Sequence, residues 1–229
     1  MYIVNKMPEQ ISREVLTELS ETDPGTIGHF IDAGIMDPGI QGRMLGARIV
    51  GTAVTIRVTV PDSVIGHYAL KFARPGDILV VERGQDQRTA CYGGSSALGA
   101  ARAGVAGLII DGVANDISEA NAAGLPIWCR GVTPLTTKYR NLGGALNVTV
   151  SCGGVSVNPG DVIMADENGV IVIPRSDVDH ILAATRAFRK KEEGFRAAMR
   201  DNPDTPLPDL SGASKFVEDY LALHPDRIS

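Results

Sequence analysis

Hydrophobic positions along the chain alternate between helical and strand-like spacing, and the two patterns together predict an α/β protein. Apolar residues recur at helical spacing from Glu9 to Leu19, which predicts an amphipathic opening helix. β-Branched residues dominate positions 47–60, which predicts strand structure that Gly51 could bend. Arg74–Asp77 is typical of a turn, and we expect it to lead into a strand at 78–81.

The centre of the chain has a clearer β-α rhythm. The glycine turn Gly93–Gly94 precedes a predicted helix over 95–102, and the next strand is expected at 105–110. That strand is apolar on both faces, as is typical of a strand covered on both sides. Asp111–Gly112 is predicted to close it, before a short helix over 116–123 and one more strand at 127–129.

The last third of the chain predicts a hairpin followed by helices. Asn168–Gly169 indicates a tight turn between strands at 162–165 and 170–173. A long, charged helix is expected from 177 to about 200. Residues 202–208 are a stiff, proline-rich linker before a last helix over 213–223. Because an isolated helix of that length is marginal in water, we expect one α/β domain over 1–200 and a tail over 201–229 whose helix docks on its own or a neighbouring subunit.

Composition narrows the class of protein. The 229 residues are 44% hydrophobic and 21% charged with a net charge of −5, which are values of a globular chain with one core. No apolar window reaches the roughly 18 residues of a membrane span, and the N-terminus lacks the features of a signal peptide, so we expect a cytoplasmic protein without membrane contact. No basic run is interleaved with aromatics, which argues against nucleic-acid binding. Cys91, Cys129 and Cys152 form no C-x-x-C pair and are predicted to be buried free thiols.

Two loops carry the candidate chemistry. Asp116 follows the predicted central strand at a helix start, where an exposed carboxylate suits a hard cation. The turn at 93–97 offers backbone N–H groups at a helix N-terminus, which suit an anion. A cation and anion-binding amides facing one cavity would bind an oxo-acid. The same residues are also typical of an ordinary N-cap and an ordinary turn, so the pattern leaves both interpretations open.

Several motifs in order make the chain resemble the RraA-like family, which includes the 4-hydroxy-4-methyl-2-oxoglutarate/4-carboxy-4-hydroxy-2-oxoadipate aldolases. The stretch from Gly93 to Asp116 carries the resemblance, with Gly104–Gly107 and Asp111–Gly112 inside it. Further matches lie at Ala73–Asp77, Arg130–Pro134, Cys152–Gly154, Asn158–Asp161 and Ala165–Val170. The similarity covers roughly residues 5 to 200.

The resemblance implies an RraA-like swivelling β/β/α sandwich with flanking helices, assembled as a homotrimer or homohexamer with sites between subunits. It implies Mg²⁺ or Mn²⁺ held largely through water by Asp116, with support from Glu192 or Glu193 of a neighbouring subunit. It implies that the backbone amides of the first helical turn bind the substrate carboxylate, namely those of Gly94, Ser95, Ser96 and Ala97. Such a metal would polarise a 2-oxo group and stabilise an enolate.

One residue departs from the family pattern. The aldolases have arginine immediately before the metal-binding acid, and this chain has Asn115, which can donate hydrogen bonds but brings no charge. Our leading hypothesis is therefore a metal-dependent lyase, of aldolase or decarboxylase type, that acts on a small oxo- or hydroxy-acid with Asn115 altering the substrate. The alternatives are a non-enzymatic, protein-binding regulator, or metal-assisted hydration or hydrolysis on the same scaffold.

Two further side chains match the family. Arg130 matches a recurrent arginine and could bind substrate, or simply pair with Asp111 or Asp116. We expect a catalytic set of Asn115, Asp116 and Arg130. His67 matches a histidine often seen in the family, although a lone histidine is more often a packed or surface residue.

Overall fold

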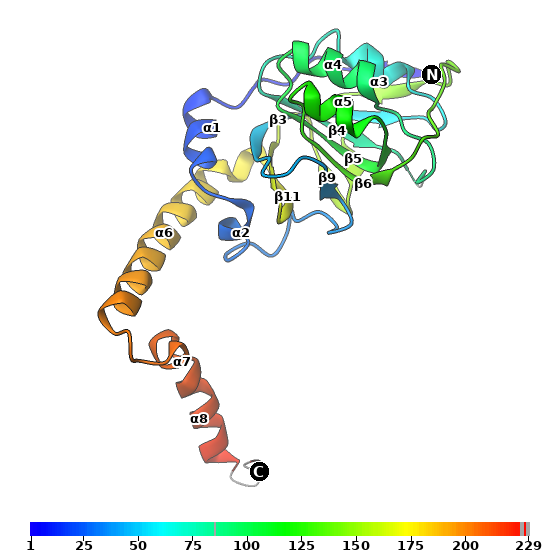
Figure 1. Cartoon of the computed structure of the whole chain (residues 1–229). Coiled ribbons are helices and arrows are strands. Elements are labelled where there is room, and N and C mark those ends of the chain that lie inside the picture. The colour runs from blue at the N-terminus through cyan, green and yellow to red at the C-terminus, as the bar shows by residue number, and fades with distance from the viewer. Residues whose placement is uncertain (85, 225–226, 228–229) are drawn as a thin grey trace. The chain divides into compact units, whose positions relative to one another are not determined.

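Four neighbouring parallel strands form the centre of the fold (Figure 1). They are β3 (Ile49–Val58), β4 (Asp77–Glu82), β5 (Gly107–Ala114) and β6 (Ile127–Val132). The computed structural model describes residues 1–84, 86–224 and 227. The sheet continues beyond β3 through β7 (Gly144–Leu146) to β1 (Tyr2–Val4), and beyond β6 to β2 (Gln41–Gly42).

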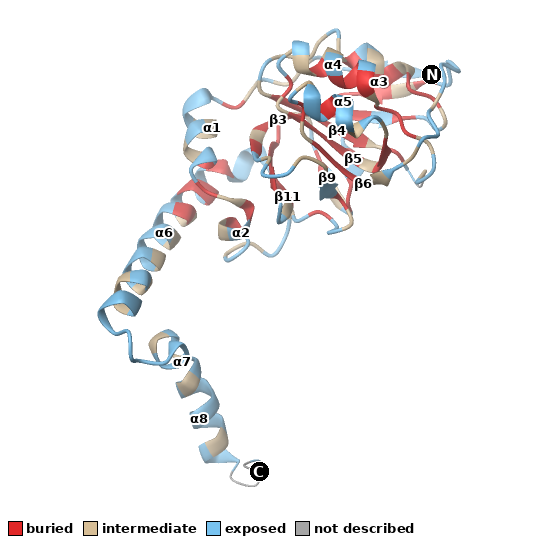
Figure 2. Ribbon diagram, viewed as in Figure 1, coloured by how far each residue is buried: buried red, intermediate tan, exposed pale blue. Residues whose placement is uncertain are grey.

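Two different layers cover the central strands. Helices α3 (Val64–Ala69), α4 (Gly94–Arg102) and α5 (Ile117–Ala122) lie over one face and bury a core with side chains such as Ile56, Leu79 and Leu108. The other face packs against β8 (Val150–Cys152), β9 (Val155–Val157) and one side of a hairpin, β10 (Val162–Asp166) and β11 (Gly169–Ile173). Figure 2 shows the strands as buried. This arrangement confirms the predicted α/β fold, a β/β/α sandwich.

The β10–β11 hairpin serves two cores because its side chains alternate. Ile163 and Ala165 face the central strands, whereas Val162 and Met164 face a third core built with the first helices. Those helices are α1 (Arg13–Ser20) and α2 (Pro24–Ile27). The prediction that the first helix begins at Glu9 was wrong, because the Ser12 side chain caps it by accepting the Val15 N–H.

The strand that leads to Asp116 is longer than predicted. Asp111–Gly112 does not close β5, which continues to Ala114. Its pairing with β6 shifts between Ile110 and Val113, so Asp111 and Gly112 form a β-bulge. β6 likewise continues to Val132, past the predicted end at residue 129. Pairing with β6 resumes after the bulge at Val113 and Ala114, so Asn115 and Asp116 follow directly at the strand's carboxyl end.

The structure divides into two compact units, Met1–Leu182 and Ala183–Ser229. Helix α6 (Val178–Asp201) follows a short 3-10 turn at Arg175–Asp177 and spans the boundary. The last helix, α8 (Ala213–Leu223), has the predicted bounds, and a short helix α7 (Leu207–Ser211) occupies part of the predicted linker. Among the described residues, no helix is both long and apolar enough to cross a membrane. All three cysteines are buried free thiols, as predicted.

A buried carboxylate fixes the segment that precedes α3. Asp62 is 1% exposed and accepts backbone N–H bonds from Ser63, Val64, Arg140 and Leu142 at 2.7 to 3.2 Å. Burial by itself raises the pKa of Asp62, but these donors outweigh it and hold the pKa below its usual value. Asp62 therefore ties the start of α3 to the loop at 140–142.

We predict that Asp62→Ala lowers the free energy of unfolding by about 2–4 kcal/mol, because it leaves several backbone donors without their charged acceptor. Urea denaturation of both proteins measures the loss. Since the folded pKa is depressed, the wild-type advantage should be present above the unfolded value of about 3.9 and disappear as the pH falls through the folded pKa. Asp32→Ala, at an exposed carboxylate, is the control. Equal stability of the two variants at pH 7 would contradict this role.

Candidate functional site

The candidate site lies where three parallel strands end and three helices begin. α3 follows β3, α4 follows β4, and α5 follows β5, so their connecting segments meet at one edge of the sheet (Figure 1). The carboxyl edge of parallel strands is where α/β proteins commonly bind ligands. A common cavity is lined by His67 of α3, by the Gly93–Ser96 turn that follows β4, and by Asn115–Asp116, which follow β5.

Three oxygen-bearing side chains crowd over the Gly93–Gly94 turn. A Cβ built on Gly93 would overlap the Asn115 Oδ1 atom and lie 2.9 Å from Asp116 Oδ2, while a Cβ on Gly94 would overlap the Glu119 carboxylate. Neither glycine has a positive φ, so the neighbouring oxygens, and not the backbone conformation, exclude a side chain here. Glu119 was missed from the sequence, although it lies one helical turn after Asp116.

Asp116 adopts a conformation that non-glycine residues rarely use. Its φ of 52° and ψ of 40° place it in the left-handed region at the N-cap of α5. Aspartate tolerates this region better than most residues, and such outliers collect at functional sites. The turn directs the carboxylate back toward α4, where Oδ2 accepts the Gly94 N–H at 3.1 Å. Its other oxygen has no hydrogen bond within the described residues, and the residue is exposed.

The four amides predicted to bind a carboxylate are not equivalent. The Gly94 N–H is bonded to Asp116, and the Ala97 N–H donates to the Gly93 carbonyl at 2.8 Å. The Gly93 N–H itself donates to the Ser96 hydroxyl at 2.9 Å. Ser95 and Ser96 occupy the second and third positions of α4, where backbone N–H groups have no intrahelical acceptor. The backbone N–H groups of Ser95 and Ser96 are therefore free to donate hydrogen bonds to an anion.

Two cavities flank Asn115 and Asp116. One has a volume of about 210 Å³ and is also lined by His67, by the start of α4 and by Tyr139. The other, of about 380 Å³, lies on the side of Val132–Pro134. The smaller one is below the usual range of about 300–1,000 Å³ for drug-sized ligands, so it suits a small acid.

The cavity wall contains a histidine–tyrosine pair. Half-buried His67 forms a 2.9 Å hydrogen bond between its Nδ1 and the Tyr139 hydroxyl, and the rings meet edge to face with centroids 5.2 Å apart. Burial lowers the pKa of His67 below its usual value of 6.5. Burial therefore favours the neutral form of the ring. Sequence reasoning weighed His67 as an ordinary packed residue and did not single out Tyr139, whose partner is distant along the chain.

Arg130 is placed with two other acids. Its guanidinium bonds Asp111 at 2.5 Å and Asp37 at 3.1 Å, and these bonds raise its pKa further. Asp111 also accepts the Gly153 N–H at 2.9 Å, so the pair joins β5, β6 and the loop after β8. Arg130 lines neither cavity beside Asp116. Of the two partners that the sequence allowed, the structure pairs it with Asp111, and its catalytic role stays a prediction.

Glu192 and Glu193 lie on α6 in the second unit, apart in the chain from the unit that holds Asp116. Glu192 accepts a hydrogen bond from Arg196 at 2.7 Å, an i, i+4 pair. Their predicted role requires another copy of the chain, and it stays a prediction.

The residues at Asp116 fit a water-rich hard cation. Within the described part of the chain, no group of three or more His, Cys, Asp or Glu side chains could enclose a metal ion. Mg²⁺ keeps several of its waters and commonly uses one or two carboxylates, whereas structural Zn²⁺ needs four protein ligands. The exposed Asp116 carboxylate beside the Asn115 amide oxygen therefore fits Mg²⁺ or Mn²⁺ and does not fit a closed zinc site.

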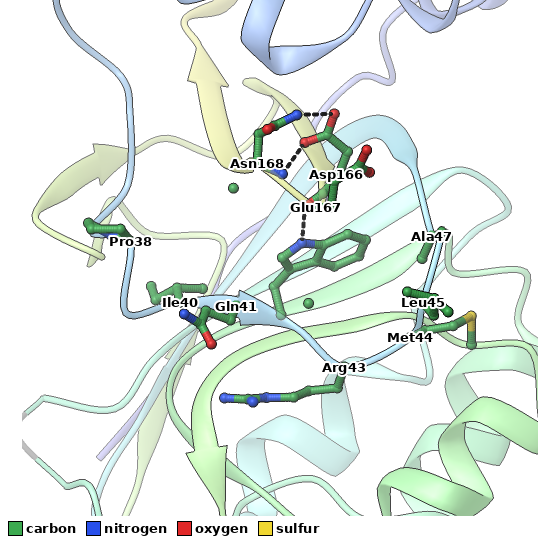
Figure 3. Close-up of a pocket in the computed structure, with 14 residues that line it drawn as sticks. Pro38, Ile40, Gln41, Arg43, Met44, Leu45, Ala47, Asp166, Glu167 and Asn168 are labelled. Carbon is green, nitrogen blue, oxygen red and sulfur yellow. Dashed lines mark hydrogen bonds between the residues drawn. The ribbon is translucent and has the colours of Figure 1, made fainter.

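A larger cavity, of about 550 Å³, lies elsewhere in the first unit, between the loop at 38–47 and the β10–β11 turn (Figure 3). Three of its polar side chains already have partners within the protein. Asp166 accepts both the backbone N–H and the carboxamide of Asn168, and Arg43 donates to Cys129. None of the predicted site residues lines this cavity. The chemistry therefore concentrates at the smaller one.

Comparisons with known proteins match this chain to one family. A family model described as RraA-like, Aldolase/RraA, matches residues 19–172. A protein of Halalkalibacterium halodurans, provisionally named 4-hydroxy-4-methyl-2-oxoglutarate aldolase, is 36% identical over 156 residues, which are 68% of this chain and 73% of the relative.

Solved structures give the same result. Streptomyces coelicolor RraAS2, described as an unusual member of the RNase ES inhibitor RraA protein family, is 28% identical and superposes with a TM-score of 0.73 over 82% of this chain and 98% of its own. The RNA-processing inhibitor RraA from Thermus thermophilis is 26% identical with a TM-score of 0.59, over 72% and 93% of the two chains. The relatives thus include both proteins named as aldolases and proteins named as inhibitors.

We predict that Gly93→Ala displaces Asn115 and Asp116 and lowers the free energy of unfolding by about 1–3 kcal/mol, because the new methyl group overlaps their oxygens and weakens the charge-assisted bond to Gly94. Chemical denaturation measures the change. Gly194→Ala, on α6 with open space around it, is the control and should be neutral or slightly stabilising. If Gly93→Ala is as stable as wild type, the oxygens do not crowd the turn.

Proposed function

The chain belongs to the RraA-like family, and from that premise we propose that it is a divalent-metal-dependent lyase, of aldolase or decarboxylase type, acting on a small oxo- or hydroxy-acid. The observation that carries this proposal is the convergence of Asn115 and Asp116 on the start of α4. It brings a carboxylate for a cation and open amides for an anion to one small cavity. Relatives named as aldolases support the choice of reaction class.

Each residue of the site has a separate role in this proposal. Asp116 holds Mg²⁺ or Mn²⁺ mainly through water, and the Ser95 and Ser96 amides bind the substrate carboxylate at the positive end of α4. When bound, the metal polarises the 2-oxo group and stabilises negative charge on its oxygen. The proposed assembly is a homotrimer or homohexamer, in which Glu192 or Glu193 of a second copy supports the metal's waters.

Asn115 sets the substrate preference in this proposal. An arginine at this position would grip an oxo-acid with two charged donors, whereas the Asn115 amide is neutral and both accepts and donates. A substrate that presents a hydroxyl or neutral carbonyl beside the metal suits the amide better than a second anionic group does.

A protein-binding regulator is the second candidate function. It is favoured by the RraA inhibitors among the matched structures and by the loss of the family arginine. Under this alternative the Asp116 cluster only holds α5 to α4, and neither metal nor oxo-acids should bind there.

We predict that Mg²⁺ stabilises the wild-type protein and that Asp116→Ala abolishes the effect. A ligand that binds only the folded state at 100 times its Kd adds about 2.7 kcal/mol to the free energy of unfolding. Thermal denaturation across a Mg²⁺ and Mn²⁺ titration measures it, with Asp32→Ala as a control that should keep the response. A metal response that persists in Asp116→Ala removes this carboxylate from the site.

We predict that wild type releases little pyruvate from oxaloacetate or 4-hydroxy-4-methyl-2-oxoglutarate and that Asn115→Arg gains this activity. Charge-assisted hydrogen bonds of about 1.5–3 kcal/mol correspond to a gain of roughly ten- to a hundred-fold. A coupled pyruvate assay with Mg²⁺ compares the proteins. Asn115→Lys restores charge without the fork geometry and should gain less. Strong release by wild type, undiminished relative to the arginine variant, would show that Asn115 is no barrier.

A further inference from the structure

The cavity that holds Asn115 and Asp116 also contains a group able to move protons. His67 lies on α3 and Tyr139 on the segment after β6, and both line the 210 Å³ cavity together with the open amides of α4. We infer that His67 is the acid–base residue of this site and that Tyr139 positions its ring. This inference rests on the proposed lyase function, for which the metal and the amides supply binding but no proton donor.

Buried contacts hold His67 in place. The Tyr92 hydroxyl, fully buried, donates to the carbonyl of Gly66, the residue before His67, at 2.9 Å. Burial raises the pKa of Tyr92 well above its usual value, so the phenol keeps its proton and remains a donor. The Tyr92 carbonyl in turn accepts the Asn115 N–H at 3.1 Å. One residue thus links the backbone beside His67 to the backbone of the proposed substrate site.

Tyr139 is exposed, but its segment is anchored on both sides. Before it, Ala90 pairs with Thr136, with backbone bonds of 2.9 Å to Leu135 and Thr137. After it, the Asp62 carboxylate accepts the N–H groups of Arg140 and Leu142. The same carboxylate caps the start of α3, so a single buried group fixes both partners of the His67–Tyr139 pair.

The hydrogen bond to Tyr139 also determines which ring nitrogen of His67 can exchange a proton with a substrate. A protonated imidazole carries hydrogen on both nitrogens, so a partner of Nδ1 that persists through proton transfer must accept. We therefore assign Nδ1–H as the donor and the Tyr139 oxygen as the acceptor. This assignment leaves the Nε2 lone pair, which has no partner among the described residues, to take a proton. Burial of the ring favours the neutral form that carries this lone pair.

In an aldol cleavage, His67 can then both remove and return the one proton that moves. Nε2 removes the proton of the substrate's 4-hydroxyl, the C3–C4 bond breaks, and its electron pair forms the enolate of the 2-oxo-acid product. The second product leaves with a new carbonyl group. His67 returns the same proton to C3, which regenerates the neutral ring and gives the 2-oxo-acid. In a decarboxylation, carbon dioxide leaves instead and the substrate supplies no hydroxyl proton. Nε2 then takes a proton from water, which leaves hydroxide, and passes that proton to C3, so the ring is again neutral.

The test measures proton transfer at C3 of the 2-oxo-acid, because this step can be followed without the natural substrate. The full-length protein with Mg²⁺ is incubated in D₂O with pyruvate, 2-oxobutyrate and 2-oxoglutarate, and deuterium exchange at C3 is followed by NMR. His67→Gln should lower exchange by at least about a hundred-fold, the lower range for losing a general acid–base. Tyr139→Phe should lower it by about ten-fold, as for one lost hydrogen bond. His180→Gln, a histidine outside the cavity, should not change it.

A binding measurement distinguishes a variant that has lost proton transfer from one whose site is no longer formed. The affinity for pyruvate with Mg²⁺, measured by calorimetry, should be the same in wild type, His67→Gln and Tyr139→Phe, since neither side chain holds the anion. Added imidazole should restore part of the exchange in His67→Ala. Exchange by His67→Gln at the wild-type rate overturns this inference alone, as does a wild type that binds pyruvate but exchanges none of the three acids. Pyruvate binding that is lost in His67→Gln also overturns it, since His67 would then act in binding. A wild type that neither binds pyruvate nor exchanges any of the three acids overturns the proposed lyase function and the inference with it.

Discussion

The bond from the Gly94 N–H to the Asp116 carboxylate is the contact on which the candidate site depends. It joins the starts of α4 and α5 and requires Asp116 to turn through the left-handed region at the end of β5. The two glycines are needed because oxygens of Asn115, Asp116 and Glu119 occupy the space where their side chains would lie. Negative side chains at the positive end of a helix are favourable, which supports the placement of Asp116 at the start of α4.

Arg130 adds no positive charge to the wall of either cavity beside Asp116. Its guanidinium is bonded to Asp111 and Asp37, and among the described residues no lysine or arginine lines the cavity that holds Asp116. With Asn115 in place of arginine, the positive potential for an anionic substrate would come from the helix N-terminus and a bound cation alone. Such a site should discriminate against substrates with a second anionic group near the metal, where a fork of charged donors would have been needed.

Buried polar groups behind the cavity make its walls rigid. Asp62 and Tyr92 are both almost fully buried and bond to backbone groups of segments distant in sequence. Such networks are strongly directional because an unsatisfied buried partner is costly, so they fix loops more sharply than apolar packing does. In this way loops after β3, β4 and β6, which would otherwise move independently, present side chains to one small cavity.

The sequence by itself determined the elements and the family. Periodicity predicted the central strands, the β10–β11 hairpin and α8, and the Gly93 and Asp116 motifs predicted which loops meet. It could not predict the bulge at Asp111–Gly112, since a strand that continues past Asp-Gly depends on its pairing with β6. Nor could it tell which backbone amides of α4 remain free or which acid pairs with Arg130. It also did not indicate that Glu119 and Tyr139 lie at the site. Local spacing fixes backbone preference, but hydrogen bonds between residues as distant as His67 and Tyr139 exist only once the tertiary structure brings their segments together.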